Sequence, residues 1–244
     1  MPDWTTFFAI AGVVLVLLLV LARLSSGAVT DSTEREPIAN ESTAVLLANV
    51  AISQGLFATV LVIAVWITSI PPFALGVEFS SQASVGLTGL LTGITAGILL
   101  YLFNVAGSMV AKARDVDFDA RLREQLTPDS HSAWVLLLVG VLPIIAVFEE
   151  LLFRAILIGV TSVGTGLSPW LFAGGSSVVF AVGHGVQGRL GMLVTGVLGF
   201  ALAVVFIISN SLLAVVVAHY LVNALEFLCT DRIERLLGRH TSAF

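Results

Sequence analysis

Long apolar stretches recur along this 244-residue sequence and constrain its fold more than any other feature. A helix needs about 20 apolar residues to cross a bilayer. Seven stretches come close to or exceed that length: 7–24, 44–70, 84–111, 133–159, 168–186, 190–208 and 211–229. Hydrophobic residues make up 57% of the chain and charged residues only 11%, which soluble domains do not approach. The sequence predicts an all-α, polytopic transmembrane helical bundle with about seven spanning helices, in a range of six to eight.

The remaining composition excludes several classes of protein. One cysteine, Cys229, excludes a disulfide framework and a cysteine-rich metal site. A net charge of -5 argues against nucleic acid as a partner. The lipid bilayer is therefore the expected partner, and the cell membrane of a prokaryote the expected location.

Basic residues are concentrated in every second connection, which predicts how the chain is oriented. They are Arg23 and Arg35 in the first, Lys112, Arg114, Arg121 and Arg123 in the third, Arg189 in the fifth, and Arg232, Arg235 and Arg239 after the last span. Because positive charge favours cytoplasmic loops, we expect the N-terminus outside and the C-terminus in the cytoplasm. The short joint at Ser209 to Ser211 leaves a re-entrant turn as an alternative.

The chain divides into three predicted regions. Residues 1–132 hold the N-terminal helices and loops, 133–229 the core that carries the polar motifs, and 230–244 a cytoplasmic tail. The first apolar run lacks the basic start of a signal peptide, so we expect a retained anchor. Gly89, Gly93 and Gly97 form overlapping GxxxG steps, which predict close packing of the third span on another helix.

Three charges interrupt the fourth span in the stretch FEELLFR. Each would cost about 2.5 to 3.5 kcal/mol at the bilayer centre unless it is compensated. Glu150 and Arg154 are four residues apart on one helical face and can form an ion pair. Glu149 points about 100° away and lacks a partner on its own helix. A buried structural ion pair with a spare acid is the alternative interpretation.

Two further spans carry polar residues. In FAVGHG, Phe180 and His184 are one turn apart, and Gly183 and Gly185 on either side of the histidine would let a substrate backbone approach. In HYLVNALEF, a polar stripe follows one helical face and consists of His219, Asn223 and Glu226. An interfacial histidine in the fifth span and interhelical hydrogen bonds in the seventh are the alternative interpretations.

Together these polar faces suit hydrolysis of an amide. Glu149 can take a proton from water, and His184 can hold that water or relay its proton. Asn223 and His219 can donate hydrogen bonds to a developing oxyanion. Glu226 can bind a substrate cation or position His219. Two other functions stay open: a non-catalytic immunity or scaffold protein, and a proton-coupled transporter.

The motifs EELLFR, FAVGH and HYLVN resemble, in order and spacing, the EExxxR, FxxxH and HxxxN motifs of the CAAX protease and bacteriocin-processing (CPBP) family of intramembrane endopeptidases. The resemblance covers about 133–229, and no motif position is substituted. It implies a catalytic glutamate at Glu149, a paired acid and arginine at Glu150 and Arg154, and further site residues at Phe180, His184, His219 and Asn223. The implied substrate is a membrane-associated peptide or lipidated protein, including the prenylated CAAX type.

The same residues leave the cofactor open between none and Zn²⁺. Glu149, His184 and His219 could be three zinc ligands with an open position for water. We favour metal-free chemistry, because Glu149 as a ligand would leave Glu150, already tied to Arg154, as the sole nearby base.

Overall fold

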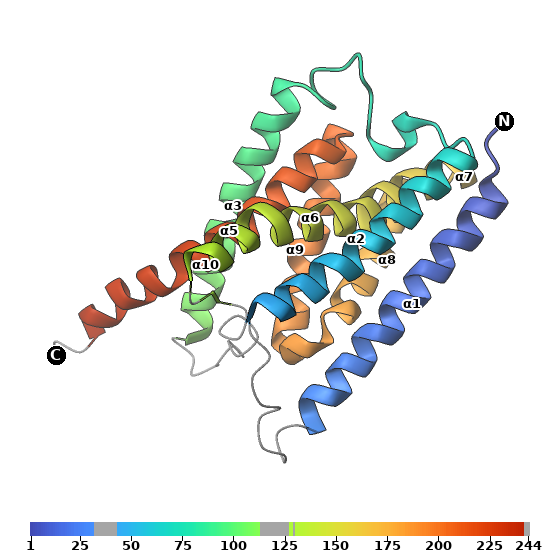
Figure 1. Cartoon of the computed structure of the whole chain (residues 1–244). Helices are drawn as coiled ribbons and strands as arrows, with labels where there is room; N and C mark the ends of the chain where they lie inside the picture. Colours follow the sequence, from blue (N-terminus) through green and yellow to red (C-terminus); the bar gives the residue numbers. More distant parts are fainter. Residues whose placement is uncertain (32–42, 113–126, 129, 242–244) are drawn as a thin grey trace.

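The computed structural model describes residues 1–31, 43–112, 127–128 and 130–241, and all regular structure in these ranges is helical. The elements are α1 (Trp4–Asp31), α2 (Thr43–Ile67), η1 (Pro72–Leu75), α3 (Leu87–Lys112), α5 (His131–Val135), η2 (Leu136–Val141), α6 (Leu142–Glu150), η3 (Leu151–Val160), α7 (Thr161–Thr165), α8 (Pro169–Gly183), η4 (Gly185–Gln187), α9 (Gly188–Ser209) and α10 (Leu212–Thr241). The predicted all-α bundle is confirmed (Figure 1).

Six helical stretches in the described ranges are long and apolar enough to cross a membrane, which makes the chain an integral membrane protein. They are Trp4–Leu24, Leu47–Ile67, Leu87–Val110, His131–Thr165, Gly185–Ser209 and Leu212–Cys229. The seventh apolar helix, α8, has 15 residues and rises only about 22 Å. It is therefore shorter than the span predicted over 168–186, because the helix ends before His184 rather than after it.

The helical stretch from His131 to Thr165 loosens its winding twice. It begins as α5, loosens to the π-helix η2, tightens to α6, and loosens again to the π-helix η3. Pro143 lies at the start of α6, directly after η2. Because proline has no N–H and crowds the preceding turn, it accounts for the loosened winding before it.

Glycines let α3 lie directly against α10, as the GxxxG steps predicted. A Cβ at Gly93 would come within 2.6 Å of the Ala214 carbonyl oxygen, and one at Gly97 within 2.9 Å of Leu221 Cβ. The two helices run side by side in Figure 1, and α10 packs more extensively on α3 than on any other helix. This contact holds α10, which carries His219, close to the rest of the bundle.

A short turn joins α9 to α10, and the segment before α3 holds it in place. Asn210 ends α9 in the left-handed conformation, with φ of 46°. The Ser211 hydroxyl donates to the Ser84 carbonyl at 2.6 Å, and the Leu212 N–H donates to the Gly76 carbonyl at 3.0 Å. The joint at 209–211 is therefore a tight turn between two long helices.

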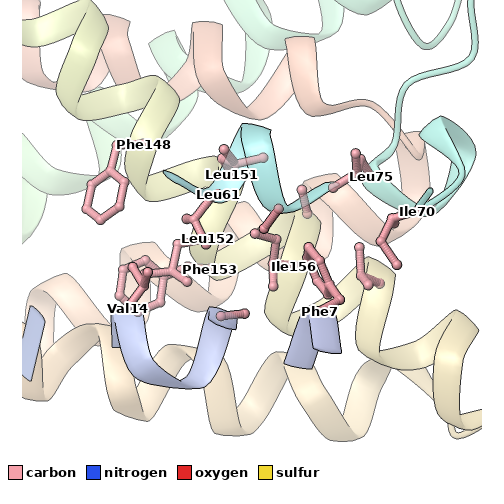
Figure 2. Packing of buried hydrophobic residues seen from close by; sticks show 14 of the residues in the cluster. Phe7, Val14, Leu61, Ile70, Leu75, Phe148, Leu151, Leu152, Phe153 and Ile156 are labelled. Atoms are coloured by element: carbon pink, nitrogen blue, oxygen red, sulfur yellow. The ribbon is translucent and has the colours of Figure 1, made fainter. Parts of the chain in front are cut away.

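A buried apolar cluster joins α1, α2, η1 and the 148–156 region (Figure 2). Phe7 and Val14 come from α1, Leu61 from α2, and Leu152 and Ile156 from η3. The first apolar run is thus part of the packed bundle. The cluster packs the helix that carries the acidic motif against α1 and α2.

Two predicted features fall partly or wholly outside the described residues. Arg35, Arg114, Arg121 and Arg123, on which the predicted orientation rests, lie there. The predicted tail at 230–244 begins as a helix, because α10 continues without a break past Cys229 to Thr241.

Candidate active site

The predicted ion pair between Glu150 and Arg154 forms in the interior. Arg154 Nη1 donates to Glu150 Oε1 at 2.8 Å, and the two residues are 1% and 0% exposed. Arg154 Nη2 donates to the Gly199 carbonyl on α9 at 2.9 Å. The guanidinium carbon lies 4.6 Å from the centre of the Phe180 ring, within cation–π range. The arginine therefore links η3 to α8 and α9 as well as to its acid partner.

Glu150 has a second partner that the sequence did not predict. Its Oε1 lies 2.6 Å from Nδ1 of His219 on α10. A carboxylate that already accepts from an arginine is ionised, so it accepts the Nδ1 proton of the imidazole. The ion pair thereby orients a histidine from another helix and fixes which of its nitrogens faces away.

Glu149 lies at the centre of a group contributed by three elements. Its Oε2 is 3.7 Å from Nε2 of His219 and 3.9 Å from Nε2 of His184. Both separations exceed the length of a hydrogen bond. Oε2 is buried and has no hydrogen-bond partner among the described residues. The structure thus brings together three polar side chains that are remote in sequence and leaves a gap between them.

His184 stands at the end of α8, where the helix stops. Its Nδ1 lies 2.8 Å from the Phe180 carbonyl oxygen, and its ring packs 4.4 Å from the Phe180 ring, centre to centre. Its side chain is 25% exposed, compared with 10% for Glu149. Gly183 has no heavy atom within 4 Å of the position of a Cβ, and Gly185 opens the turn η4. The group is therefore most accessible on the side of His184.

The partners of the two Nδ1 atoms determine the tautomer of each neutral ring. A carbonyl oxygen only accepts, so Nδ1 of His184 carries the proton, as Nδ1 of His219 does toward Glu150. In a neutral imidazole the other nitrogen then holds a lone pair. Both Nε2 atoms consequently present acceptors toward Glu149.

The nitrogen and oxygen atoms of this group are of the types that bind zinc, but they lie too far apart to coordinate one zinc ion. Two ligands about 2.1 Å from a tetrahedral zinc are about 3.4 Å apart, whereas the two carboxylate–imidazole separations are 3.7 and 3.9 Å. No group of three or more His, Cys, Asp or Glu side chains in the described part of the chain meets the geometry for a metal ion. As placed, the residues do not fit a zinc ion, and the reaction steps below use none.

Two predicted residues lie further along α10. Asn223 is half-buried one turn beyond His219, and its side chain makes no hydrogen bond with a described residue. Glu226 is half-buried as well, but it already interacts with another group. The asparagine is thus available to a substrate, whereas Glu226 is not a free carboxylate.

Sequence reasoning missed the residues that support the group from behind. A Cβ at Gly199 would lie 2.8 Å from Phe180 Cδ1 and 3.2 Å from Arg154 Nη2, so only a glycine fits there without movement. Phe153 packs edge-on against Phe180, and the Ser176 hydroxyl donates to the Phe153 carbonyl at 2.6 Å. Gly199 and Ser176 lie in predominantly apolar helices and belong to none of the three motifs, so no local pattern marks them.

Fold and site together define a polytopic helical membrane protein with a buried acid–histidine group contributed by α6, α8 and α10. Residues 131–225 match the family model described as "Type II CAAX prenyl endopeptidase Rce1-like". This segment is therefore a domain of the type II CAAX prenyl endopeptidase family, whose members are intramembrane proteases. The match spans all three motifs and confirms the resemblance in the sequence. No curated protein and no solved structure matches the chain.

Proposed function

We propose that this protein is an intramembrane endopeptidase that hydrolyses a peptide bond of a membrane-associated substrate. One observation carries the proposal: Glu149 Oε2 has no hydrogen-bond partner among the described residues and faces Nε2 of both histidines across 3.7 and 3.9 Å. A water molecule about 2.8 Å from each group would span those separations, and it would donate one hydrogen to Glu149 and the other to one of the imidazoles. A buried carboxylate that takes one hydrogen of a water and an imidazole lone pair that holds the other are the groups that water activation needs.

The reaction begins with a proton transfer inside this group. The Glu149 carboxylate takes one proton of the water, while Nε2 of His184 accepts the other hydrogen and orients the oxygen. The resulting hydroxide oxygen attacks the carbonyl carbon of the scissile bond. Glu149 then passes its proton to the leaving nitrogen as the carbon–nitrogen bond breaks. The acid returns to its ionised form, and the products are a carboxylic acid and an amine.

The tetrahedral intermediate needs a hydrogen-bond donor for its oxyanion. Asn223 is suited to this role, because its amide lies one turn from His219 and bonds to no described residue. His219 can donate from Nε2 only as an imidazolium, since Nδ1 is directed to Glu150. In this proposal Glu150, Arg154 and Phe180 position His219 and His184 and do not contact the substrate.

The family description directs the choice of substrate to a prenylated C-terminal CAAX-type sequence. A lipidated peptide is concentrated at the bilayer and can reach a site inside a helical bundle. In the predicted orientation, the turn after His184 faces the cytoplasm. We therefore propose that the substrate approaches on the side of His184.

Substitution of Glu149 tests this function. Purified protein in nanodiscs is incubated with prenylated and unprenylated C-terminal peptides, and products are identified by mass spectrometry. We expect Glu149→Gln to lower the cleavage rate at least about 100-fold, because it removes the base that takes the proton of water. Glu78→Gln is the matched control, since Glu78 is an exposed carboxylate outside the site.

Cleavage at the wild-type rate by Glu149→Gln would show that another group activates the water. The same assay with a chelator tests the metal-free chemistry. Activity lost to the chelator and restored by zinc would contradict the steps derived above.

A further inference from the structure

A glutamine interrupts the inward-facing stripe of α2. The stripe repeats at helical spacing and consists of Leu47, Ala51, Gln54, Ala58 and Leu61. Gln54 Oε1 is buried and has no hydrogen-bond partner among the described residues. Leaving a buried amide oxygen without a donor costs about 1 to 3 kcal/mol. A bound ligand could therefore supply the hydrogen-bond donor that this oxygen lacks.

The neighbours of Gln54 on α2 show at which level of α6 it lies. One turn before it, Ala51 packs into the same apolar cluster as Ile145 of α6. One turn after it, Phe57 stacks on Phe148 with ring centres 6.0 Å apart. Gln54 thus lies level with the turn of α6 between Ile145 and Phe148, which directly precedes Glu149.

Asn223 lies at a similar level on α10. On α10, His219 faces Glu149, and Ala224 packs in one cluster with Leu142 of α6. The turn of α10 from His219 to Ala224 is therefore level with the middle of α6. Asn223 belongs to that turn. Gln54 and Asn223 therefore carry two amides at about the level of Ile145, on the two helices that pack against α6.

We propose that Gln54 accepts a hydrogen bond from a backbone N–H of the peptide substrate and so sets the position of the scissile bond at Glu149. An extended peptide presents N–H and C=O groups on every residue, so one acceptor beside the path recognises it without selecting side chains. The acceptor oxygen is buried, and a hydrogen bond gains strength from the low local dielectric of a buried position. This inference rests on the proposed function and adds α2 to the elements that contact the substrate.

A coupling experiment between protein and substrate tests the contact. The probe is a fluorescent farnesylated peptide with three residues after the prenylated cysteine, together with analogues in which an ester replaces one backbone amide at a time. Binding to protein in nanodiscs is measured by anisotropy in the Glu149→Gln background, so that no cleavage interferes. Gln54→Met removes the acceptor at nearly constant length, and Ser53→Ala on the exposed face of α2 is the matched control.

We expect one ester analogue to bind about 3- to 10-fold more weakly than the all-amide peptide when Gln54 is present, and equally well when it is Met. Gln54→Met alone should weaken the all-amide peptide by the same factor. Any of three results would overturn the proposal. The ester could weaken binding equally in both proteins, Gln54→Met could bind the all-amide peptide with wild-type affinity, or the peptide could fail to bind at all.

Cleavage by the protein with Glu149 intact is recorded separately. Coupled binding without cleavage supports the contact with Gln54 and contradicts the proposed peptidase. Cleavage without coupled binding supports the peptidase and overturns the role of Gln54.

Discussion

Among the single residues, Glu150 contributes both to the stability of the fold and to the geometry of the site. Its Oε1 accepts from both Arg154 and His219 in a fully buried position. Removing one partner of a buried ion pair lowers stability more than replacing both partners with apolar residues, because the remaining charge is left without compensation. Arg154 is thus required to compensate the charge of Glu150 in the interior, and Glu150 in turn to orient His219.

A pair of substitutions separates these roles. We expect Arg154→Met to lower the free energy of unfolding by about 3 to 5 kcal/mol, since it leaves Glu150 buried without its counter-charge. Glu150→Gln in addition should restore part of the loss in stability but not the orientation of His219. Denaturant titration of the protein in mixed micelles measures the stability.

Arg189→Met, at an exposed position, controls for the loss of an arginine. If the double variant is as unstable as the sum of the two single variants, the charges are not coupled as described.

At the scale of elements, close packing of helices determines where His219 lies. The backbone of α3 approaches α10 at Gly93, beside Ala214, and at Gly97, beside Ala218, the residue before His219. Side-chain volume inserted there has no space, because the obstacles at Gly93 include the Ala214 backbone. Movement of α10 would carry His219 away from Glu149 and Glu150.

Two glycines of α3 provide a matched comparison. Gly93→Val should lower the free energy of unfolding by about 1 to 3 kcal/mol and reduce proteolysis, because it overpacks the contact with α10. Gly107→Val adds the same volume on the same helix, where no heavy atom lies within 4 Å of a Cβ. Thermal unfolding and peptide cleavage are measured for both variants. Equal effects of the two substitutions would exclude the α3–α10 contact as the cause.

At the scale of the whole molecule, the site opens toward one end of α8. Ser168 precedes the helix at one end, and Arg189 follows the turn at the other; both are exposed. The predicted orientation puts Ser168 outside and Arg189 in the cytoplasm, on the side of the basic connections. Substrate would then enter from the cytoplasmic side.

Labelling of introduced cysteines in intact cells tests this orientation, with Cys229 first replaced by alanine. A membrane-impermeant thiol reagent should label Ser168→Cys directly and Arg189→Cys only after permeabilisation. The opposite pattern would reverse the orientation and place the open side of His184 outside.

The all-helical membrane architecture follows from the sequence, because apolar runs of about 20 residues have few other stable forms in a bilayer. The ion pair of Glu150 with Arg154 and the separate direction of Glu149 also follow from the sequence, since both depend on the spacing along one helix. The three motifs could therefore be recognised from local pattern alone.

Which polar groups come into contact depends on the packing of separate helices. The bond from His219 to Glu150, the carbonyl of Gly199 beneath Arg154 and the early end of α8 all depend on how separate helices pack. Gln54 belongs to the same class, because its significance comes from its level beside α6 and not from its neighbours in sequence. Local spacing fixes the direction of a side chain on its own helix, whereas contacts between helices depend on packing that no single stretch of sequence contains.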